Sequence, residues 1–249
     1  MTRLFILLTT FAITLTTLGG GISTSHAQAF TEAQRAEINR MFEDYISNNG
    51  RVLVDSVARY QAEEEETALK EQGTKAQKFL STLKGKKDLP MTGNPKGDVT
   101  IVEFFDYNCG YCRKALTEVT KVVEADKNVR VVFVDMPILG PSSLEISKWS
   151  MAANMQGKYF EFHRAVMNKN GQKNETVLSK IAADLGLDVA KMKKDKESEA
   201  VNLALQKNLA IADEIGLRGT PAFIIAEQVI GGYVPSEQMK TIIAAARSK

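Results

Sequence analysis

Residues 99–112 read V-T-I-V-E-F-F-D-Y-N-C-G-Y-C, and the rest of the chain is organised around this stretch. Val99–Phe105 is rich in β-branched and aromatic residues, which predicts a buried strand, and residues 113–125 have the pattern of a helix. Cys109 and Cys112 therefore lie at a strand-to-helix junction, in the first turn of the helix. Because the free N–H groups and the positive dipole end of a helix favour an anion, we expect the Cys109 thiolate to be stabilised there.

The chain has only two cysteines. Exported proteins use most of their cysteines as structural cross-links, but a bond between Cys109 and Cys112 closes a loop too small to constrain the unfolded chain much. The pair is better explained as a reactive dithiol. A structural zinc site needs four ligands, and residues 28–249 offer only these two cysteines and His163. We therefore expect no metal and no other cofactor.

The first 27 residues have the pattern of a secretory signal peptide. Arg3 supplies the positive charge, residues 4–18 are uncharged and mostly apolar, and Ser25-His26-Ala27 is a small-residue cleavage signal before Gln28. The apolar stretch is short for a membrane span, so an uncleaved anchor is the less favoured alternative. The mature chain, residues 28–249, is expected to be exported.

The positive and negative charges of the chain are nearly balanced. With 32 Lys and Arg against 30 Asp and Glu, the composition gives no argument for binding nucleic acid or acidic membranes. A hydrophobic content of 44% is ample for one full core.

Two helices are expected in residues 28–84, before the main domain. The first has a capping-box pattern at Thr31 and Gln34, and its apolar residues fall on one face: Ile38, Met41, Phe42, Tyr45 and Ile46. An amphipathic helix outside a self-sufficient domain must still bury its apolar stripe, which favours self-association over a solvated helix lying on the main domain. The second helix, residues 52–83, has a strongly charged middle that suits a stalk, a hinge or a partner helix.

The main domain is predicted to span residues 98–249, after a glycine- and proline-rich linker at residues 85–97. Val129–Asp135 is a second buried strand, parallel to the first by the βαβ rule. A helical insert is expected at about residues 142–215, followed by a hairpin and a final helix. The order β-α-β, helical insert, β-β-α predicts an α/β fold. Within the insert, His163 and Trp149 are interpreted as a helix-face residue and a core residue.

This domain resembles the thioredoxin superfamily, specifically the DsbA-like periplasmic thiol-disulfide oxidoreductases with an all-helical insertion. The resemblance covers residues 98–249 and rests on three features: the Cys109-Gly110-Tyr111-Cys112 motif at the strand–helix junction, Glu103 inside the preceding strand, and Gly219-Thr220-Pro221 before a later strand. It implies a thioredoxin fold, a periplasmic location and exported client proteins with cysteines as substrates.

The resemblance also implies roles for individual residues. Cys109 would be the exposed nucleophile, and the more buried Cys112 would resolve the mixed disulfide. Glu103 would accept the proton of Cys112, and a buried carboxylate should have a raised pKa; the alternative is an edge-strand acid that faces solvent. Thr220 and Pro221 would form a cis bond that faces the cysteines and binds an extended client chain, with a simple turn as the alternative.

The N-terminal extension resembles that of the suppressor-of-copper-sensitivity C proteins and related oligomeric members. In those, several catalytic domains associate, as a trimer in some, and act together as a disulfide isomerase that a membrane thiol reductase keeps reduced. Gly110 and Tyr111 place no imidazole beside Cys109, unlike the strongly oxidising members, which favours an isomerase or reductase. Two alternatives stay open: a DsbA-type oxidase recharged by a quinone-linked membrane oxidase, and a non-enzymatic copper- or client-binding protein.

Overall fold

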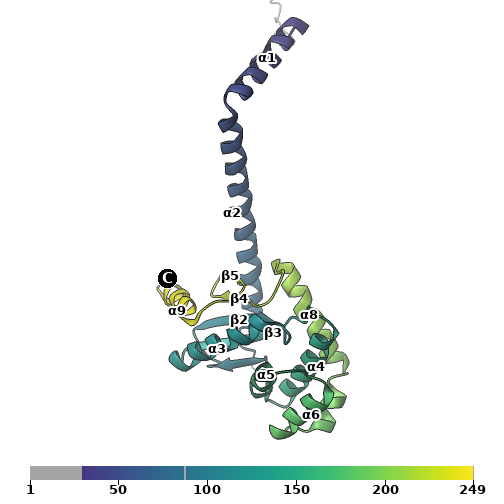
Figure 1. Cartoon of the computed structure of the whole chain (residues 1–249). Coiled ribbons are helices and arrows are strands. Elements are labelled where there is room, and N and C mark those ends of the chain that lie inside the picture. Colours follow the sequence, from purple (N-terminus) through teal and green to yellow (C-terminus); the bar gives the residue numbers. More distant parts are fainter. Residues whose placement is uncertain (1–29, 87, 249) are drawn as a thin grey trace, which may run out of the picture. The chain divides into compact units, whose positions relative to one another are not determined.

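A computed structural model describes residues 30–86 and 88–248, so the predicted signal peptide lies outside the described residues. Within them the elements are, in chain order, α1 (Glu32–Asn48), α2 (Gly50–Leu83), β1 (Met91–Gly93), β2 (Val99–Phe105), α3 (Gly110–Ala125), β3 (Val129–Asp135), α4 (Pro141–Met155), α5 (Tyr159–Asn168), α6 (Glu175–Asp184), α7 (Val189–Asp195), α8 (Glu199–Ile215), β4 (Ala222–Ile225), β5 (Gln228–Gly231) and α9 (Ser236–Arg247) (Figure 1). Two compact units share the chain, and the second begins at Tyr60.

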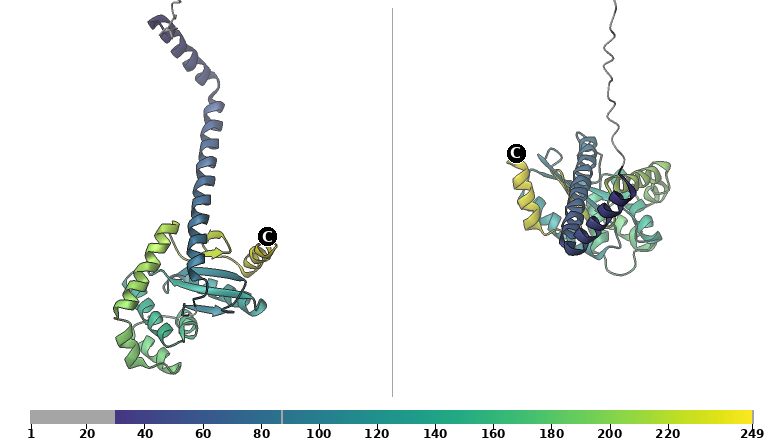
Figure 2. Two further views of the ribbon diagram at one scale, coloured as in Figure 1. Left: turned by 180° about the vertical axis from the view of Figure 1, so that it is seen from behind. Right: turned by 90° about the horizontal axis from the view of Figure 1, so that it is seen from above.

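The strands form one mixed sheet in the order β1-β3-β2-β4-β5, and Figure 2 shows this sheet among the helices from two further sides. β2 and β3 are parallel, as predicted, with Val99 opposite Val129. β4 runs antiparallel to β2 on its other side, with Phe223 opposite Glu103. The strand that leads to the two cysteines is therefore central in the sheet.

Alternate side chains of the strands pack on opposite faces of the sheet, as the two-residue period of a strand requires. One face carries Ile101, Phe105 and Phe133, which belong to the same buried cluster as residues of α3, α5 and α9. The other face carries Val102, Phe104 and Ile224, which cluster with residues of α2 and α8. Because both faces are covered, β2 and β3 consist of nearly continuous apolar residues.

The helical insert, α4 to α8, lies between β3 and β4, so the chain has the thioredoxin fold with the insertion that the resemblance implies. Side-chain caps explain where three of its helices begin. Asn174, Asp188 and Ser198 each accept a hydrogen bond from the backbone N–H three residues further on. Short polar residues at these positions define the helix starts through contacts within one turn.

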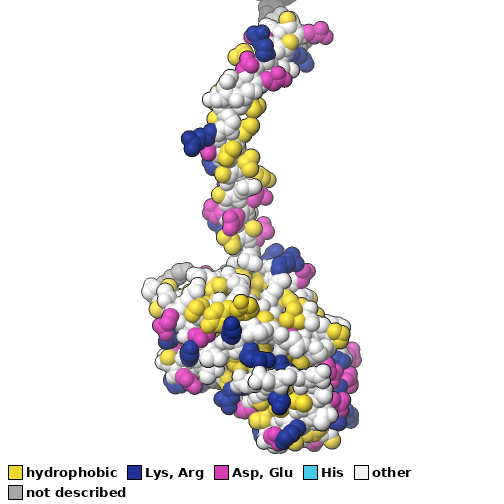
Figure 3. Space-filling view, in the orientation of Figure 1, with side chains coloured by type: hydrophobic (Ala, Val, Ile, Leu, Met, Phe, Trp, Pro, Cys, Tyr) yellow, Lys and Arg dark blue, Asp and Glu magenta, His cyan; other side chains and the backbone are white. Residues whose placement is uncertain are grey.

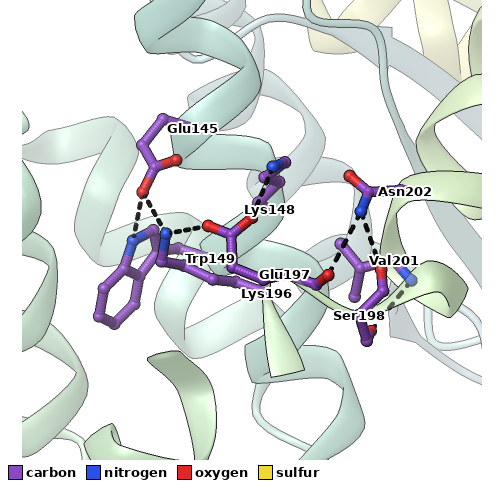
Figure 4. A network of polar contacts seen from close by, with 8 residues as sticks. All are labelled: Glu145, Lys148, Trp149, Lys196, Glu197, Ser198, Val201 and Asn202. Atoms are coloured by element: carbon purple, nitrogen blue, oxygen red, sulfur yellow. Dashed lines mark hydrogen bonds and ion pairs between the residues drawn. The ribbon is translucent and has the colours of Figure 1, made fainter. Parts of the chain in front are cut away.

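An ion network around the buried Lys196 side chain links helices of the insert (Figure 4). The Lys196 side chain, just after α7, pairs with Glu145 of α4 at 2.9 Å and with the neighbouring Glu197. Glu197 also pairs with Lys148 at 2.9 Å, and Glu145 accepts a hydrogen bond from the Trp149 indole at 3.1 Å. Trp149 is fully buried, as predicted. The network fixes the start of α8 to α4 and so orients the helix that leads to β4.

Residues 85–97, the predicted linker, contain the short strand β1, which pairs with β3. No apolar run marks this strand; its position depends on close approach between backbones. A Cβ on Gly93, which has φ of 81°, would lie 2.5 Å from the Val129 carbonyl oxygen. Just before it, the end of α2 is held by Arg130, which donates to the carbonyls of Leu83 at 3.0 Å and Lys86 at 2.8 Å. The compact unit therefore begins well before residue 98.

The first helix keeps its apolar side chains exposed. α1 begins with the predicted capping box at Thr31 and Gln34, and none of its residues is buried against any described residue. Met41 and Phe42 are each more than half exposed, and Figure 3 shows hydrophobic side chains along this part of the chain. In the part of the chain that the structure describes, no helix is long and apolar enough to cross a membrane.

Candidate active site

Cys109 lies at the point where the chain turns from β2 into α3. It is the N-cap of α3, with an extended backbone, and its Sγ accepts a hydrogen bond from the Cys112 N–H at 3.4 Å. The sulfur thus occupies the place that a serine or aspartate oxygen takes in other helix caps, where it meets the positive end of the helix dipole. Both cysteines are free thiols.

The two thiols differ in their exposure. Cys109 is 9% exposed, whereas Cys112 has no exposed surface. Burial raises the pKa of the Cys112 thiol well above its usual range, and a hydrogen bond with the backbone of Asp106 acts in the opposite direction. Cys112 therefore stays protonated near neutral pH. A base is needed before its sulfur can act as a nucleophile.

The carboxyl of Glu103 lies close enough to both thiols to interact with their charges. It lies on β2 between Phe133 of β3 and Phe223 of β4 and is 1% exposed, so it is not an edge-strand acid facing solvent. Burial raises the pKa of Glu103 to about 8, with a smaller contribution from the charge of Cys109. Its Oε2 atom has no hydrogen-bond partner among the described residues. A carboxyl in this state can hold or release a proton in the range where thiols react.

The loop before β4 completes the surroundings of the first thiol. The Thr220–Pro221 bond is cis, as predicted, and Pro221 is buried at the start of β4. The Cys109 thiol donates a hydrogen bond to the Thr220 carbonyl at 3.3 Å. The fold thereby brings together all five of the residues that the sequence singled out, although 111 residues separate Cys109 from Thr220.

Asp106, directly after β2, stabilises the turn that leads to Cys109 and was not among the residues predicted from the sequence. It is 1% exposed, and its carboxylate accepts four hydrogen bonds, from the backbone N–H groups of Asn108 at 2.7 Å, Ile138 at 2.9 Å and Leu139 at 3.0 Å and from the Ser143 hydroxyl at 2.7 Å. Its carbonyl accepts the Cys109 N–H at 3.1 Å. A charged residue directly after a buried strand is the signal that would have indicated such a role.

Two basic residues lie beside the same turn. Lys173, in the loop between α5 and α6, donates to the Tyr107 carbonyl at 2.6 Å, and Arg113 donates to Asn170 of that loop at 3.0 Å. Burial lowers the pKa of Lys173, and the nearby charge of Arg113 lowers it further. The loop is thus fastened to the first turn of α3. No local pattern indicates the Lys173 contact, because it joins residues 66 positions apart.

His163 is a core residue rather than a helix-face residue or a base for the thiols. It is fully buried, its Nδ1 lies 3.1 Å from the Tyr107 hydroxyl, and burial lowers its pKa to about 3. The ring is therefore neutral at physiological pH. Across the described residues, no group of three or more His, Cys, Asp or Glu side chains converges to form a metal site.

Comparisons with known proteins agree with this geometry. A family profile described as a DSBA-like thioredoxin domain matches residues 100–244. The structure of a thioredoxin-like oxidoreductase from Silicibacter pomeroyi is 41% identical, with a TM-score of 0.63 over 66% of this chain and 95% of that one. A linker-deletion mutant of ScsC from Proteus mirabilis is 22% identical, with a TM-score of 0.66 over 90% and 99%. At that identity the second likeness concerns the fold alone.

Curated relatives fall into two groups. Disulfide bond formation protein D from Bacillus subtilis is 22% identical over 185 residues, which cover 70% of this chain and 82% of that protein. The chain also matches Na(+)/H(+) antiporters named NhaA, such as the one from Salinispora arenicola at 24% identity over 183 residues. It spans only 28% of the length of that antiporter.

Proposed function

Since the chain belongs to the DsbA-like thioredoxin family of thiol-disulfide oxidoreductases, we propose that it is a disulfide isomerase or reductase acting on protein clients. The observation that carries the proposal is the asymmetric pair of thiols. Cys109 is the more accessible thiol, caps a helix and contacts the Thr220 carbonyl, while Cys112 is buried near a carboxyl with a raised pKa. One thiol is arranged to react first and the other to follow.

The first step is an attack of the Cys109 thiolate on a client disulfide. A bond forms between Cys109 Sγ and one client sulfur, the client S–S bond breaks, and the other client sulfur leaves as a thiolate. Before the attack, the charge of the Cys109 thiolate is stabilised by the Cys112 N–H and the positive dipole end at the start of α3. The Thr220 and Pro221 backbone beside Cys109 would hold the client chain as an added strand.

Two second steps are open to the mixed disulfide. In isomerisation, a client thiolate attacks the client sulfur, forms a new client disulfide and releases Cys109 as a thiolate. In reduction, Cys112 attacks Cys109 Sγ, Glu103 accepts the Cys112 proton, and the client sulfur leaves as a thiolate. The second route leaves a Cys109–Cys112 disulfide, which a membrane thiol reductase would have to reduce.

The residues between the cysteines favour this direction over oxidation. Tyr111 is 61% exposed, and its ring lies under the Lys114 ammonium at 5.1 Å rather than on a sulfur. No imidazole adjoins Cys109 in the motif, so the thiolate has less stabilisation than in strongly oxidising relatives, and its disulfide is a weaker oxidant. The signal-peptide pattern supports action in the periplasm.

Self-association through α1 is part of the proposal. The half-buried Ile38 and the exposed Met41, Phe42 and Tyr45 line a shallow apolar hollow on one helix face, and a stripe of this kind is normally covered by a partner. The N-terminal residues 28–84 would join copies of the chain, with a trimer as the state that the resemblance implies. Phe42→Glu in the full chain should lower the mass measured by sedimentation, whereas the exposed control Arg40→Gln should leave it unchanged.

Refolding of ribonuclease tests the enzymatic proposal. Recovery of scrambled ribonuclease that is lost in Cys109→Ala supports isomerisation. Activity confined to reduced ribonuclease would instead show a DsbA-type oxidase, and rescue that survives the mutation would show a non-enzymatic client-binding protein. Alkylation trapping in cells gives an independent readout: a mostly oxidised pair would contradict the isomerase assignment.

A further inference from the structure

The segment that leads from α8 to the cis-proline is buried at Leu217, whose N–H bonds to the Ala212 carbonyl at 2.8 Å, but residues 218–220 are exposed or half-buried. α8 ends at Ile215 and is capped by Gly216 in the left-handed conformation, with φ of 81°. Arg218 pairs with Asp213 at 3.0 Å, but both side chains are 79% exposed, so that pair adds little rigidity. The position of Thr220 beside Cys109 therefore depends on how the start of this segment is held.

Helix α2 holds that start. The Gln72 side chain donates a hydrogen bond from Nε2 to the Ile215 carbonyl at 3.1 Å, across 143 residues of sequence. The helix passes close to the cap, since a Cβ on Gly216 would lie 3.8 Å from the same Gln72 nitrogen. One α2 side chain thus binds the last helical carbonyl before the loop that carries the cis bond.

The neighbouring turn of α2 is anchored to a different place. Gln77 donates to the Glu227 carboxylate at 3.0 Å, at the turn between β4 and β5. Behind these polar contacts, Ala76 of α2 and Ile215 and Leu217 belong to one buried cluster. Figure 1 shows this end of α2 beside β4 and β5. Gln72 and Gln77 therefore make the same kind of bond from the same helix, but only Gln72 reaches the segment that precedes Thr220.

A groove connects α2 with the cis-proline. It has a volume of about 350 Å³, and its walls are Gln72, residues 216–222 and the glycines at the end of β5. Gln72 thus lines the same groove as Thr220, whose carbonyl accepts the Cys109 hydrogen bond.

We propose that Gln72 is a positioning residue that holds the cis-proline loop in place for the client chain. The inference rests on the proposed function, because the loop matters only if clients bind at Thr220. Loss of the Gln72 bond frees the Ile215 carbonyl and loosens residues 216–220. The client backbone then meets a mobile loop, whereas the reactivity of the Cys109 thiolate, which depends on the start of α3, is unchanged.

The test compares Gln72→Glu with Gln77→Glu in the full chain. Each removes a side-chain donor, adds one negative charge and keeps a good helix former, so helix propensity and net charge are matched. Gln72→Lys restores a donor at the same position. Mixed-disulfide formation is measured with a cysteine-containing peptide disulfide and with the small aromatic disulfide dithiobis(nitrobenzoate), and hydrogen exchange is measured for residues 216–220.

Gln72→Glu should lower the rate with the peptide by about 3- to 10-fold, mainly through KM, the size expected for loss of one hydrogen bond. The rate with the small disulfide should stay the same, Gln77→Glu should behave as wild type, and Gln72→Lys should recover most of the loss. Equal losses with both disulfides, or unchanged hydrogen exchange in Gln72→Glu, would overturn the positioning role. Two results together would support the positioning role and overturn the proposed function. Gln72→Glu would show faster hydrogen exchange at residues 216–220, and the wild-type protein would show no reaction with peptide disulfides.

Discussion

Replacing Glu103 by glutamine should stabilise the catalytic unit, which is the compact unit that begins at Tyr60. The gain in the free energy of unfolding should grow as the pH rises. Glu103 is buried with a pKa of about 8, against an ordinary value of 4.5, because burial disfavours its charged form. The folded protein therefore keeps a proton that the unfolded chain releases between these values. The stability that this proton contributes is complete below pH 4.5 and is lost as the pH rises to about 8.

The size of the effect follows from the two pKa values. The difference between 4.5 and about 8 corresponds to a loss of up to about 5 kcal/mol of stability across this range. Glutamine has nearly the same shape and cannot ionise, so Glu103→Gln should escape the loss. At about pH 5 the two proteins should have similar free energies of unfolding, and at about pH 9 the variant should be more stable by several kcal/mol.

The free energies of unfolding are measured by urea unfolding of the reduced protein, and the fluorescence of Trp149 is used to monitor the transition. Trp149 is the only tryptophan of the chain, and it is buried in α4 of the catalytic unit, so the signal reports on that unit. Glu118→Gln is the matched control. Hydrogen bonds from Lys121 and Ser236 lower the pKa of Glu118 to about 2, so its contribution is present above pH 4.5 and should be the same at both test values.

A difference between wild type and Glu103→Gln that is equal at both pH values would refute the reasoning. It would mean that the Glu103 carboxyl is solvated or paired in the folded protein. Its role as the proton acceptor for Cys112 would then lose its physical basis.

Three further predictions concern the same region. Cys112→Ser should trap mixed disulfides with clients, seen as added mass on non-reducing gels, and Cys109→Ser should form none. Asp106→Ala leaves three partly buried N–H groups and the buried Ser143 hydroxyl without their acceptor and should destabilise the unit by about 3 kcal/mol, against about 1 kcal/mol for Ser143→Ala, by the same urea titration. Burial raises the pKa of Asp135 from 3.8 to about 7, so its neutral form stabilises the fold below pH 3.8 and this is lost as the pH rises to about 7. Asp135→Asn should remove that part of the pH dependence, and an unchanged profile would show that Asp135 is not buried and neutral.

Much of the fold follows from patterns within single elements. The β-branched run predicts β2 with its observed ends. Continuous apolar runs in buried strands and helix caps made by short polar residues are local signals. The dithiol is also visible as a short motif, whereas the cis bond before Pro221 was implied by the family resemblance.

Elements made by distant contacts were not predictable in this way. β1 has three residues and no apolar run, and it exists because its backbone pairs with β3 and Gly93 admits the Val129 carbonyl. The charged middle of the second predicted helix suits a stalk, yet Ala76 and Leu83, near the end of α2, are buried. In both cases the decisive neighbour is far away along the chain.

The site around residues 99–112 likewise has some features that follow from local sequence and others that depend on distant contacts. Local sequence is sufficient for a strand, a turn and a helix that begins at a pair of thiols, because propensity and capping act over a few residues. Other features depend on how the chain packs. These are the different burial of the two thiols, the raised pKa of Glu103, and the hydrogen bonds from Cys109 to Thr220 and from Gln72 to Ile215. A pKa or a hydrogen bond reflects the groups within a few ångströms of an atom, and folding brings those groups from sequence positions that no local pattern connects.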